Sequence, residues 1–203
     1  MFGIQKNRDT VFIIGGGPSL NKYLPDKTVL NGKDIIAVNS AYKFFPNAIC
    51  CMFMDMHWFL GNKDHLLSTF KGVPIVGAFP NEILEYRDRY KFDNILTREG
   101  DSGLSTNDKT IVGSNSGHMA INLAVKLGYK DIVLLGFDMD KLNPVTHWHK
   151  EYIRQSMVDR YDSVMIPYLN TINAHLPSGV SIWNINKESA IKCFPFTELE
   201  RFL

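Results

Sequence analysis

Short apolar runs, many of them rich in β-branched residues, alternate along the chain with stretches of helical periodicity. Buried strands of a parallel sheet are typically such continuous apolar runs. We expect strands at residues 11–14, 34–39, 48–55, 74–78, 131–138 and 180–185. We expect helices near 57–70, over 116–127, over 151–176 with an interruption at Pro167, and at 196–203. This alternation predicts one α/β domain over residues 1–203: a doubly wound, mostly parallel, Rossmann-like sheet flanked by helices.

The first strand runs directly into three glycines, Gly15, Gly16 and Gly17, followed by Pro18 and Ser19. Glycines remove every Cβ where the chain turns, so we expect backbone N–H groups to lie against a ligand. A loop at the carboxyl end of a first strand is where open α/β sheets bind phosphorylated ligands. The alternative is that these glycines, here called the glycine loop (Gly15–Gly17), only allow a tight turn.

Four predicted strands end in a polar residue or a glycine, namely Gly15, Asn39, Asp55 and Asp138. The carboxyl ends of parallel strands lie along one edge of the sheet, so these residues are expected to converge on one crevice. Each also has a local interpretation: Asn39 as a turn cap, Asp55 as a helix N-cap, and Asp138 as an acceptor for loop amides.

Small polar residues precede the clearest amphipathic helix of the sequence, which begins at Ser116. Asn115, Ser116 and Gly117 would expose free N–H groups and a hydroxyl at the helix start, and this predicts a second anion site. An ordinary cap without a ligand is the alternative. His118, next in the sequence, is expected to face either the ligand or the core.

Two histidines, His147 and His149, flank Trp148 after the strand that ends at Asp138. A histidine titrates near neutral pH, so either one suits a general base on a substrate-facing loop. A zinc site is less favoured because no third ligand has a compelling spacing. Trp148 is expected either to pack over a sugar or a base, or to anchor the loop.

Composition narrows the function classes. The 22 basic and 21 acidic residues leave a net charge of +1, without the basic excess typical of nonspecific nucleic-acid binding. Three cysteines make no disulfide framework, and no apolar run has the ~18–20 residues of a membrane span. These features predict a cytoplasmic protein. The glycine loop lacks a Walker lysine, and Asn39 stands where a dinucleotide site has an acidic residue, so both common glycine-loop families are disfavoured.

Five motifs occur in a characteristic order: Gly-Gly-Gly-Pro-Ser-Leu (15–20), Ile-Ala-Val-Asn (36–39), Asn-Ser-Gly (115–117), Leu-Gly-Tyr-Lys-Asp-Ile-Val-Leu-Leu-Gly-Phe-Asp (127–138) and His-Trp-His-Lys-Glu-Tyr (147–152). In this order they resemble a superfamily of bacterial lipooligosaccharide sialyltransferases, which use CMP-sialic acid, and MptE-like 6-hydroxymethylpterin diphosphokinases. Uncharacterised phage-encoded proteins are among its members. The resemblance covers residues 11 to 152.

The resemblance to the sialyltransferases implies that residues 16–19 and Asn39 hold a nucleotide and that Ser116 and Gly117 contact the donor. It also implies a histidine base without a metal cofactor, and the match favours His149 over His147. Of two departures, the first bears on the donor and the second on the acceptor lid. Gly16 stands where the sialyltransferases have an asparagine that touches the donor, and the segment between Asp138 and His147 is short.

Three functions follow from these observations. The first is a nucleotide-sugar-dependent glycosyltransferase with a glycan, a modified nucleobase or a small metabolite as acceptor. The second is a diphosphokinase in which Asp55 and Asp138 hold Mg²⁺ between themselves and the phosphates of ATP. The third is a non-catalytic nucleotide-binding or interaction protein. A homo-oligomer is compatible with each of the three.

Overall fold

A computed structural model describes residues 1–140, 147–148 and 159–203. In this part of the chain one parallel sheet of eight strands has the order β6-β5-β4-β3-β2-β1-β7-β8. The strands are β1 (Thr10–Ile14), β2 (Asp34–Val38), β3 (Cys50–Phe53), β4 (Val73–Ala78), β5 (Ile95–Gly100), β6 (Thr110–Val112), β7 (Asp131–Leu135) and β8 (Ser181–Asn184). The predicted α/β, Rossmann-like fold is confirmed, and every pairing among these strands is parallel.

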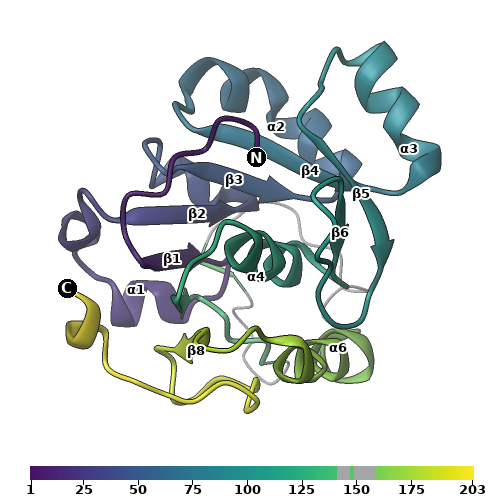
Figure 1. Cartoon of the computed structure of the whole chain (residues 1–203). Coiled ribbons are helices and arrows are strands. Elements are labelled where there is room, and N and C mark those ends of the chain that lie inside the picture. The colour runs from purple at the N-terminus through teal and green to yellow at the C-terminus, as the bar shows by residue number, and fades with distance from the viewer. Residues whose placement is uncertain (141–146, 149–158) are drawn as a thin grey trace.

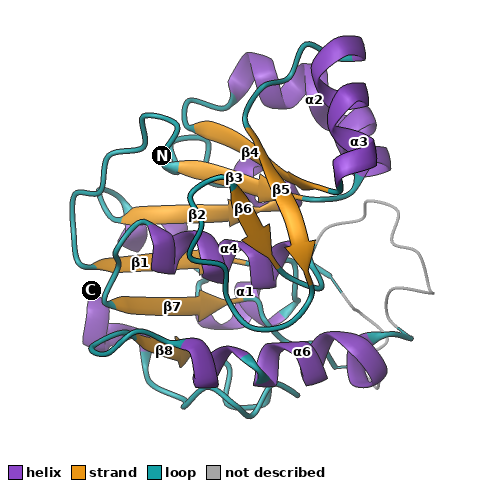
Figure 2. Ribbon diagram, turned by 45° about the vertical axis from the view of Figure 1, so that its right-hand side comes forward, coloured by secondary structure: helices purple, strands orange, loops and turns teal. Residues whose placement is uncertain are grey.

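The order of the strands reverses at β1. The chain adds β2 to β6 successively on one side of β1, and then returns to place β7 and β8 on its other side. β1 therefore lies between β2 and β7, with Ile14 opposite Ala37 on one neighbour and Leu135 on the other (Figure 2). Open α/β sheets bind ligands at such a reversal, outside the carboxyl ends of the strands.

Helices cover both faces of the sheet. The α-helices are α1 (Ser19–Tyr23), α2 (Met56–Thr69), α3 (Pro80–Leu84), α4 (Ser116–Lys126) and α6 (Ile166–Asn170). Shorter 3₁₀ turns span Lys27–Leu30, Asn39–Lys43, Ile172–His175 and Leu199–Phe202, and π turns span Glu85–Arg89 and Tyr161–Met165. Helix α4 crosses one face of the sheet, whereas α1 and α2 pack on the other (Figure 1).

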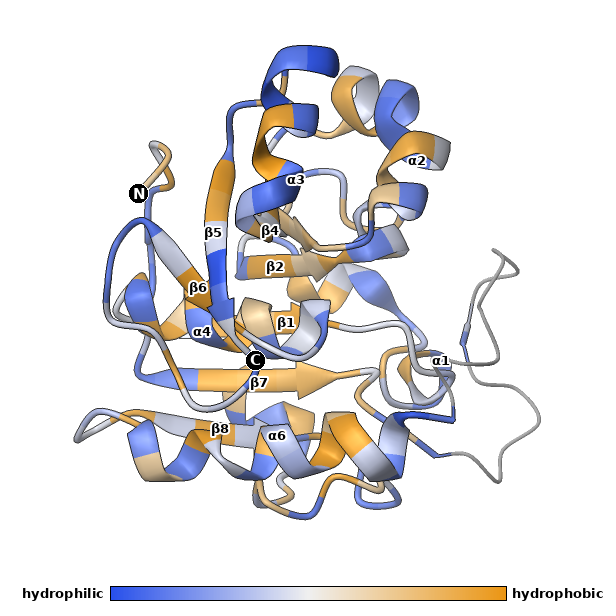
Figure 3. Ribbon diagram, turned by 90° about the vertical axis from the view of Figure 1, so that its right-hand side faces the viewer, coloured by the Kyte–Doolittle hydropathy of each residue, from blue (hydrophilic) through white to orange (hydrophobic). Residues whose placement is uncertain are grey.

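Two apolar cores follow from the alternation of side chains along each strand. Val11 and Ile13 of β1 pack under α4, whereas Phe12 and Ile14 of the same strand pack under α1 and α2. The central strands are therefore apolar on both sides, as a covered parallel sheet requires (Figure 3). The carboxyl ends of β1 and β7 are held between these two cores.

The sequence pattern missed β5, β6, α1 and α3. β5 carries Thr97, Arg98 and Glu99 in its second half, and β6 is only three residues long, so neither has a clear apolar run. Of the helix predicted over 151–176, residues 151–158 lie outside the described part of the chain. The rest is helical: a π turn over Tyr161–Met165 continues directly into α6 (Ile166–Asn170), and a 3₁₀ turn follows at Ile172–His175. The change of helix type falls at Ile166, next to Pro167, in agreement with the predicted interruption.

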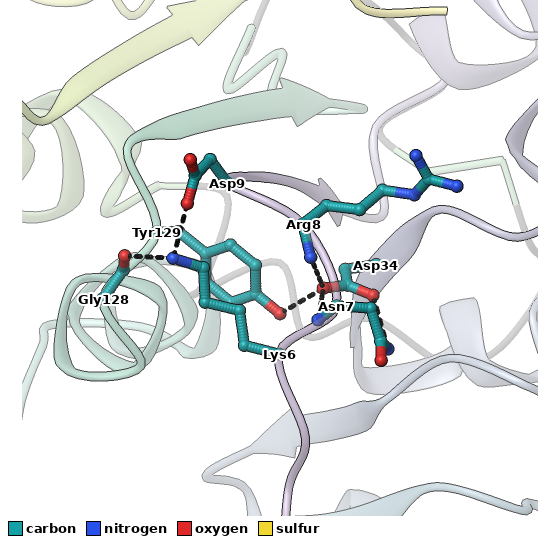
Figure 4. Close-up of polar contacts among 7 residues, drawn as sticks. All are labelled: Lys6, Asn7, Arg8, Asp9, Asp34, Gly128 and Tyr129. Atoms are coloured by element: carbon teal, nitrogen blue, oxygen red, sulfur yellow. Dashed lines mark hydrogen bonds and ion pairs between the residues drawn. The ribbon is translucent and has the colours of Figure 1, made fainter.

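Asp34 joins three segments at the amino edge of the sheet (Figure 4). The buried carboxylate accepts hydrogen bonds from the backbone amide of Asn7 at 2.8 Å, that of Arg8 at 3.2 Å and the hydroxyl of Tyr129 at 2.9 Å. The side-chain amide of Asn7 adds a fourth, at 3.1 Å. Burial, and next the bond to Asp34, raise the pKa of Tyr129, so its hydroxyl stays protonated and donates.

Replacing Asp34 by alanine is expected to destabilise the protein by about 2–4 kcal/mol, because it leaves several donors unpaired at a buried site. Urea denaturation measures this change. Asp9→Ala is the control, since Asp9 is an exposed member of an ion pair with Lys6 and its loss is expected to leave the midpoint unchanged. Equal effects of the two substitutions would contradict a structural role for Asp34.

Within the described residues, no helix is both long and apolar enough to cross a membrane.

Candidate functional site

A cavity of about 500 Å³ opens at the carboxyl edge of the sheet, where the strand order reverses. Its walls come from the segments that follow β1, β2, β3 and β7, from the start of α4, and from the π turn Tyr161–Met165. The sequence-predicted residues that line it are Gly15, Gly16, Gly17, Asn39, Asp55, Asn115, Ser116, Gly117, Asp138 and His147. Pro18 and Ser19 do not line it, and His149 lies outside the described residues.

The glycine loop makes backbone hydrogen bonds to the segment that follows β7. The amide of Gly15 donates to Leu135 O at 2.7 Å, and that of Gly17 donates to Gly136 O at 2.8 Å. A Cβ on Gly15 would lie 2.5 Å from Gly136 O, so the close approach of the two backbones requires glycine here. The amides of Gly15 and Gly17 are therefore paired within the protein, and ligand binding by the glycine loop stays a prediction. The amide of Gly16 donates to none of the described residues.

Asp138 links the glycine loop to a distant segment. Its Oδ2 accepts from the amide of Ser19 at 2.9 Å, and its Oδ1 accepts a short hydrogen bond from the side chain of Asn186. A Cβ on Gly17 would collide with this carboxylate. Burial, and next the charge of Asp138, raise the pKa of the Tyr161 hydroxyl, so Tyr161 faces the cavity as a neutral donor.

The start of α4 presents unpaired donors to the cavity. Asn115 caps the helix, with its Oδ1 3.0 Å from the amide of His118 and its backbone O 3.1 Å from that of Met119. The amides of Ser116 and Gly117 bond to none of the described residues, and the same holds for the Ser116 hydroxyl. Ser116 is only 6% exposed. Unpaired donors at the positive end of a helix dipole are an arrangement that suits an anion.

Gly117 has a packing reason to be glycine. A Cβ at this position would lie 2.8 Å from the ring of Phe137 and 3.0 Å from Asn115 Oδ1. The start of α4 is thereby pressed against the segment that follows β7. The start of α4 and the glycine loop therefore both contact the segment that follows β7.

Asn39 has an unusual backbone and an unpaired side-chain atom. Its φ of +49° lies in the left-handed region, which asparagine tolerates better than other non-glycine residues. Its side-chain Oδ1 is buried without a partner among the described residues. Strained residues with unpaired polar atoms are concentrated at ligand sites. Asn39 is the first residue of the turn Asn39–Lys43, whose N-cap position is Val38, and its unpaired Oδ1 does not cap this turn.

Asp55 has the local role that the sequence offered as an alternative. Its Oδ1 accepts from the amide of Trp58 at 3.0 Å and caps α2. Asp55 and Asp138 both line the cavity, yet each already accepts N–H bonds from the protein. No three His, Cys, Asp or Glu side chains in the described ranges gather as a metal site would require.

Trp148 anchors residues 147–148 to the glycine loop. Its backbone amide donates to Gly16 O at 3.0 Å, and its indole Nε1 donates to Gly15 O at 3.0 Å. Its ring lies 4.3 Å from that of Phe44, centroid to centroid. Of the two roles expected for Trp148, the structure shows the anchor, and the neighbouring His147 lines the cavity.

Sequence reasoning missed the part of the wall built by the π turn and the residue before it. Arg160 brings a permanent positive charge to the cavity, and Tyr161 and Met165 contribute buried side chains. Glu82 and His57 also line the cavity. Glu82 lies in no predicted element, and residues 160–165 lie inside the helix predicted over 151–176, so no pattern marked them as site residues. His57 begins the helix predicted near 57–70, but nothing in that pattern assigned its side chain to a cavity.

His118 belongs to the core. Its Nε2–H donates to Gly103 O at 2.8 Å, and its Nδ1 is buried without a partner among the described residues. Burial lowers its pKa to about 4, while the bond to the Gly103 carbonyl acts in the opposite direction. The neutral imidazole is therefore the form that the fold contains near neutral pH.

This lowered pKa predicts a loss of stability in acid. The unfolded chain protonates His118 near its ordinary pKa of 6.5 and the folded chain only near 4, so stability contributed by the neutral form falls as the pH drops between these values. The loss is on the order of 3 kcal/mol from pH 7 to pH 4. Urea denaturation across this range is expected to show a shallower pH dependence for His118→Gln than for the unmodified protein. Identical slopes would mean that His118 titrates normally.

Comparison with known proteins supports the fold assignment. No protein-family model matches the chain, and no curated protein does. The crystal structure of the monofunctional α-2,3-sialyltransferase Cst-I from Campylobacter jejuni is similar, with a TM-score of 0.57 and 15% identity over 95% of this chain and 82% of that one. The sialyltransferase CstII from Campylobacter jejuni, in complex with the substrate analogue CMP-3FNeuAc, gives a TM-score of 0.55 and 13% identity over 93% of this chain and 86% of that one.

At these identities the likeness establishes a sialyltransferase-like fold, without the chemistry. It supports the sialyltransferase side of the resemblance found in the sequence. It lends no support to the MptE-like or phage-encoded members.

Proposed function

We propose that this protein is a nucleotide-sugar-dependent glycosyltransferase whose donor phosphate binds at the start of α4. The observation that carries the proposal is the set of unpaired donors at the cavity: the amides of Ser116 and Gly117 and the hydroxyl of Ser116. Three donors on one helix turn match the oxygens of a phosphate, and the helix dipole stabilises its charge. The same charge is then stabilised when the phosphate becomes the leaving group.

The other walls suit the rest of such a donor. Asn39 offers a buried, unpaired carbonyl oxygen for an N–H or O–H group of the nucleoside or the sugar. Arg160 and the neutral hydroxyl of Tyr161 add donors for anionic or hydroxylated groups on the far wall. Since CstII, which shares the fold, was solved with a CMP-sugar analogue, a CMP-linked sugar is the first donor to test.

The motif match favours His149, which lies outside the described residues. We assign the role of general base to His147, because this residue lines the cavity. In the proposed reaction the acceptor hydroxyl loses its proton to His147, its oxygen bonds to the anomeric carbon, and the bond from that carbon to the phosphate oxygen breaks. The nucleotide leaves with the bonding electron pair, held by the donors of α4. Charge stabilisation by these protein donors makes a metal ion unnecessary in this scheme, with no bound cofactor beyond the donor itself.

Nucleotide binding tests the phosphate site. CMP is expected to raise the melting temperature without Mg²⁺ in a thermal-shift panel with UDP, GDP and ATP. Ser116→Ala is expected to weaken CMP binding about 10-fold, since it removes one hydrogen bond to a charged group. Ser68→Ala is the matched control, because Ser68 is an exposed residue of α2. Stabilisation by ATP only with Mg²⁺ would favour the diphosphokinase, and no stabilisation by any nucleotide would refute the proposal.

Transfer assays with a CMP-sugar donor test which histidine is the general base and whether the reaction needs a metal ion. His147→Ala is expected to lower kcat by about 10²–10⁴-fold, as loss of a general base does, and EDTA is expected to leave the rate unchanged. A comparable loss in His149→Ala, with His147→Ala active, would move the base to His149. Undiminished transfer by both variants, or abolition by EDTA, would overturn the proposed chemistry.

A further inference from the structure

Trp148 holds two consecutive carbonyl groups of the glycine loop at once. The main-chain N–H reaches Gly16 O and the indole N–H reaches Gly15 O, each at 3.0 Å. These bonds bring together segments that are 132 and 133 positions apart in the sequence. Since one residue supplies both donors, the position of its backbone and the direction of its side chain are fixed together.

The indole ring of Trp148 also packs against another aromatic side chain. Phe44 packs against it with a centroid separation of 4.3 Å, and the ammonium of Lys27 lies 4.6 Å above the Phe44 ring. The aromatic contact restricts rotation of the indole, and the cation restrains the Phe44 ring against which the indole packs. The glycine loop itself cannot shift, because the amides of Gly15 and Gly17 are bonded to the end of β7.

We propose that Trp148 is a positioning residue for the transfer reaction: by bonding to Gly15 O and Gly16 O it holds the adjacent His147 at the cavity. The glycine loop then has a second role: its carbonyl groups accept the hydrogen bonds that fix the position of Trp148 and, through it, of His147. This inference rests on the proposed function, because His147 acts as a base only if the cavity transfers a sugar. A base displaced by about 1 Å from its acceptor loses up to ~10²-fold in rate.

Trp148→Phe tests the proposal. It removes the indole N–H but keeps an aromatic ring against Phe44 and the backbone bond to Gly16 O. We expect kcat to fall on the order of 10-fold, while the dissociation constant for CMP changes less than about 2-fold, because the phosphate site on α4 is untouched. A merely structural role would lower both together or neither.

Trp183→Phe is the matched control. The Trp183 indole also donates one hydrogen bond, to Asp131 Oδ1 at 2.9 Å, and also packs near a phenylalanine, Phe202. Trp183 does not line the cavity, so its substitution removes the same chemistry elsewhere. We expect its kcat to stay within about 2-fold of the unmodified protein. An equal fall in both variants, or an unchanged kcat in Trp148→Phe, would overturn the proposal.

Nuclear magnetic resonance tests the positioning role of Trp148 without an activity assay, and so independently of the proposed transferase function. The Trp148 indole signal, assigned by its absence in Trp148→Phe, is expected to exchange with deuterium more slowly than a free indole. The imidazole signals of His147, assigned with His147→Ala, are expected to shift more in Trp148→Phe than in Trp183→Phe. A freely exchanging indole or unmoved imidazole signals would overturn the positioning role, whereas inactivity with every donor alongside the expected spectra would overturn only the transferase.

Discussion

The close approach of the chain segments that leave β1 and β7 is the constraint on which the rest of the site depends. Gly15 and Gly17 donate to Leu135 O and Gly136 O at 2.7 and 2.8 Å, and the amide of Ser19 donates to Asp138. Glycine is required because a Cβ would meet the opposite backbone or the Asp138 carboxylate. These bonds close the floor of the cavity at the point where the strand order reverses.

This constraint separates two roles that glycine-rich loops often combine. The Gly15 and Gly17 amides are bonded within the protein, whereas the amides of Ser116 and Gly117 at the start of α4 have no partner among the described residues. The carbonyl groups of Gly15 and Gly16 accept hydrogen bonds from Trp148. In this account one segment positions the base and another binds the anion, with Gly136–Asp138 as the wall between them.

The sequence predicted the parts of the structure that local pattern controls. Apolar runs marked the central strands, and the expectation that strand ends converge placed Asn39, Asp55 and Asp138 on one cavity. The partners of the glycine amides could not be predicted, because they depend on which strand lies beside β1, and β7 follows it by more than 100 residues. Arg160 and Tyr161 were missed because only the return of the chain past α4 brings them to the cavity. β5 was missed because its polar half lacks an apolar run.

A crystal structure of the protein with CMP bound tests the central claim most directly. The account predicts the phosphate within hydrogen-bond distance of the amides of Ser116 and Gly117 and of the Ser116 hydroxyl, with the glycine loop and Trp148 joined as they are here. A phosphate bound instead on the amides of the glycine loop, with Trp148 displaced from Gly15 O and Gly16 O, would contradict it.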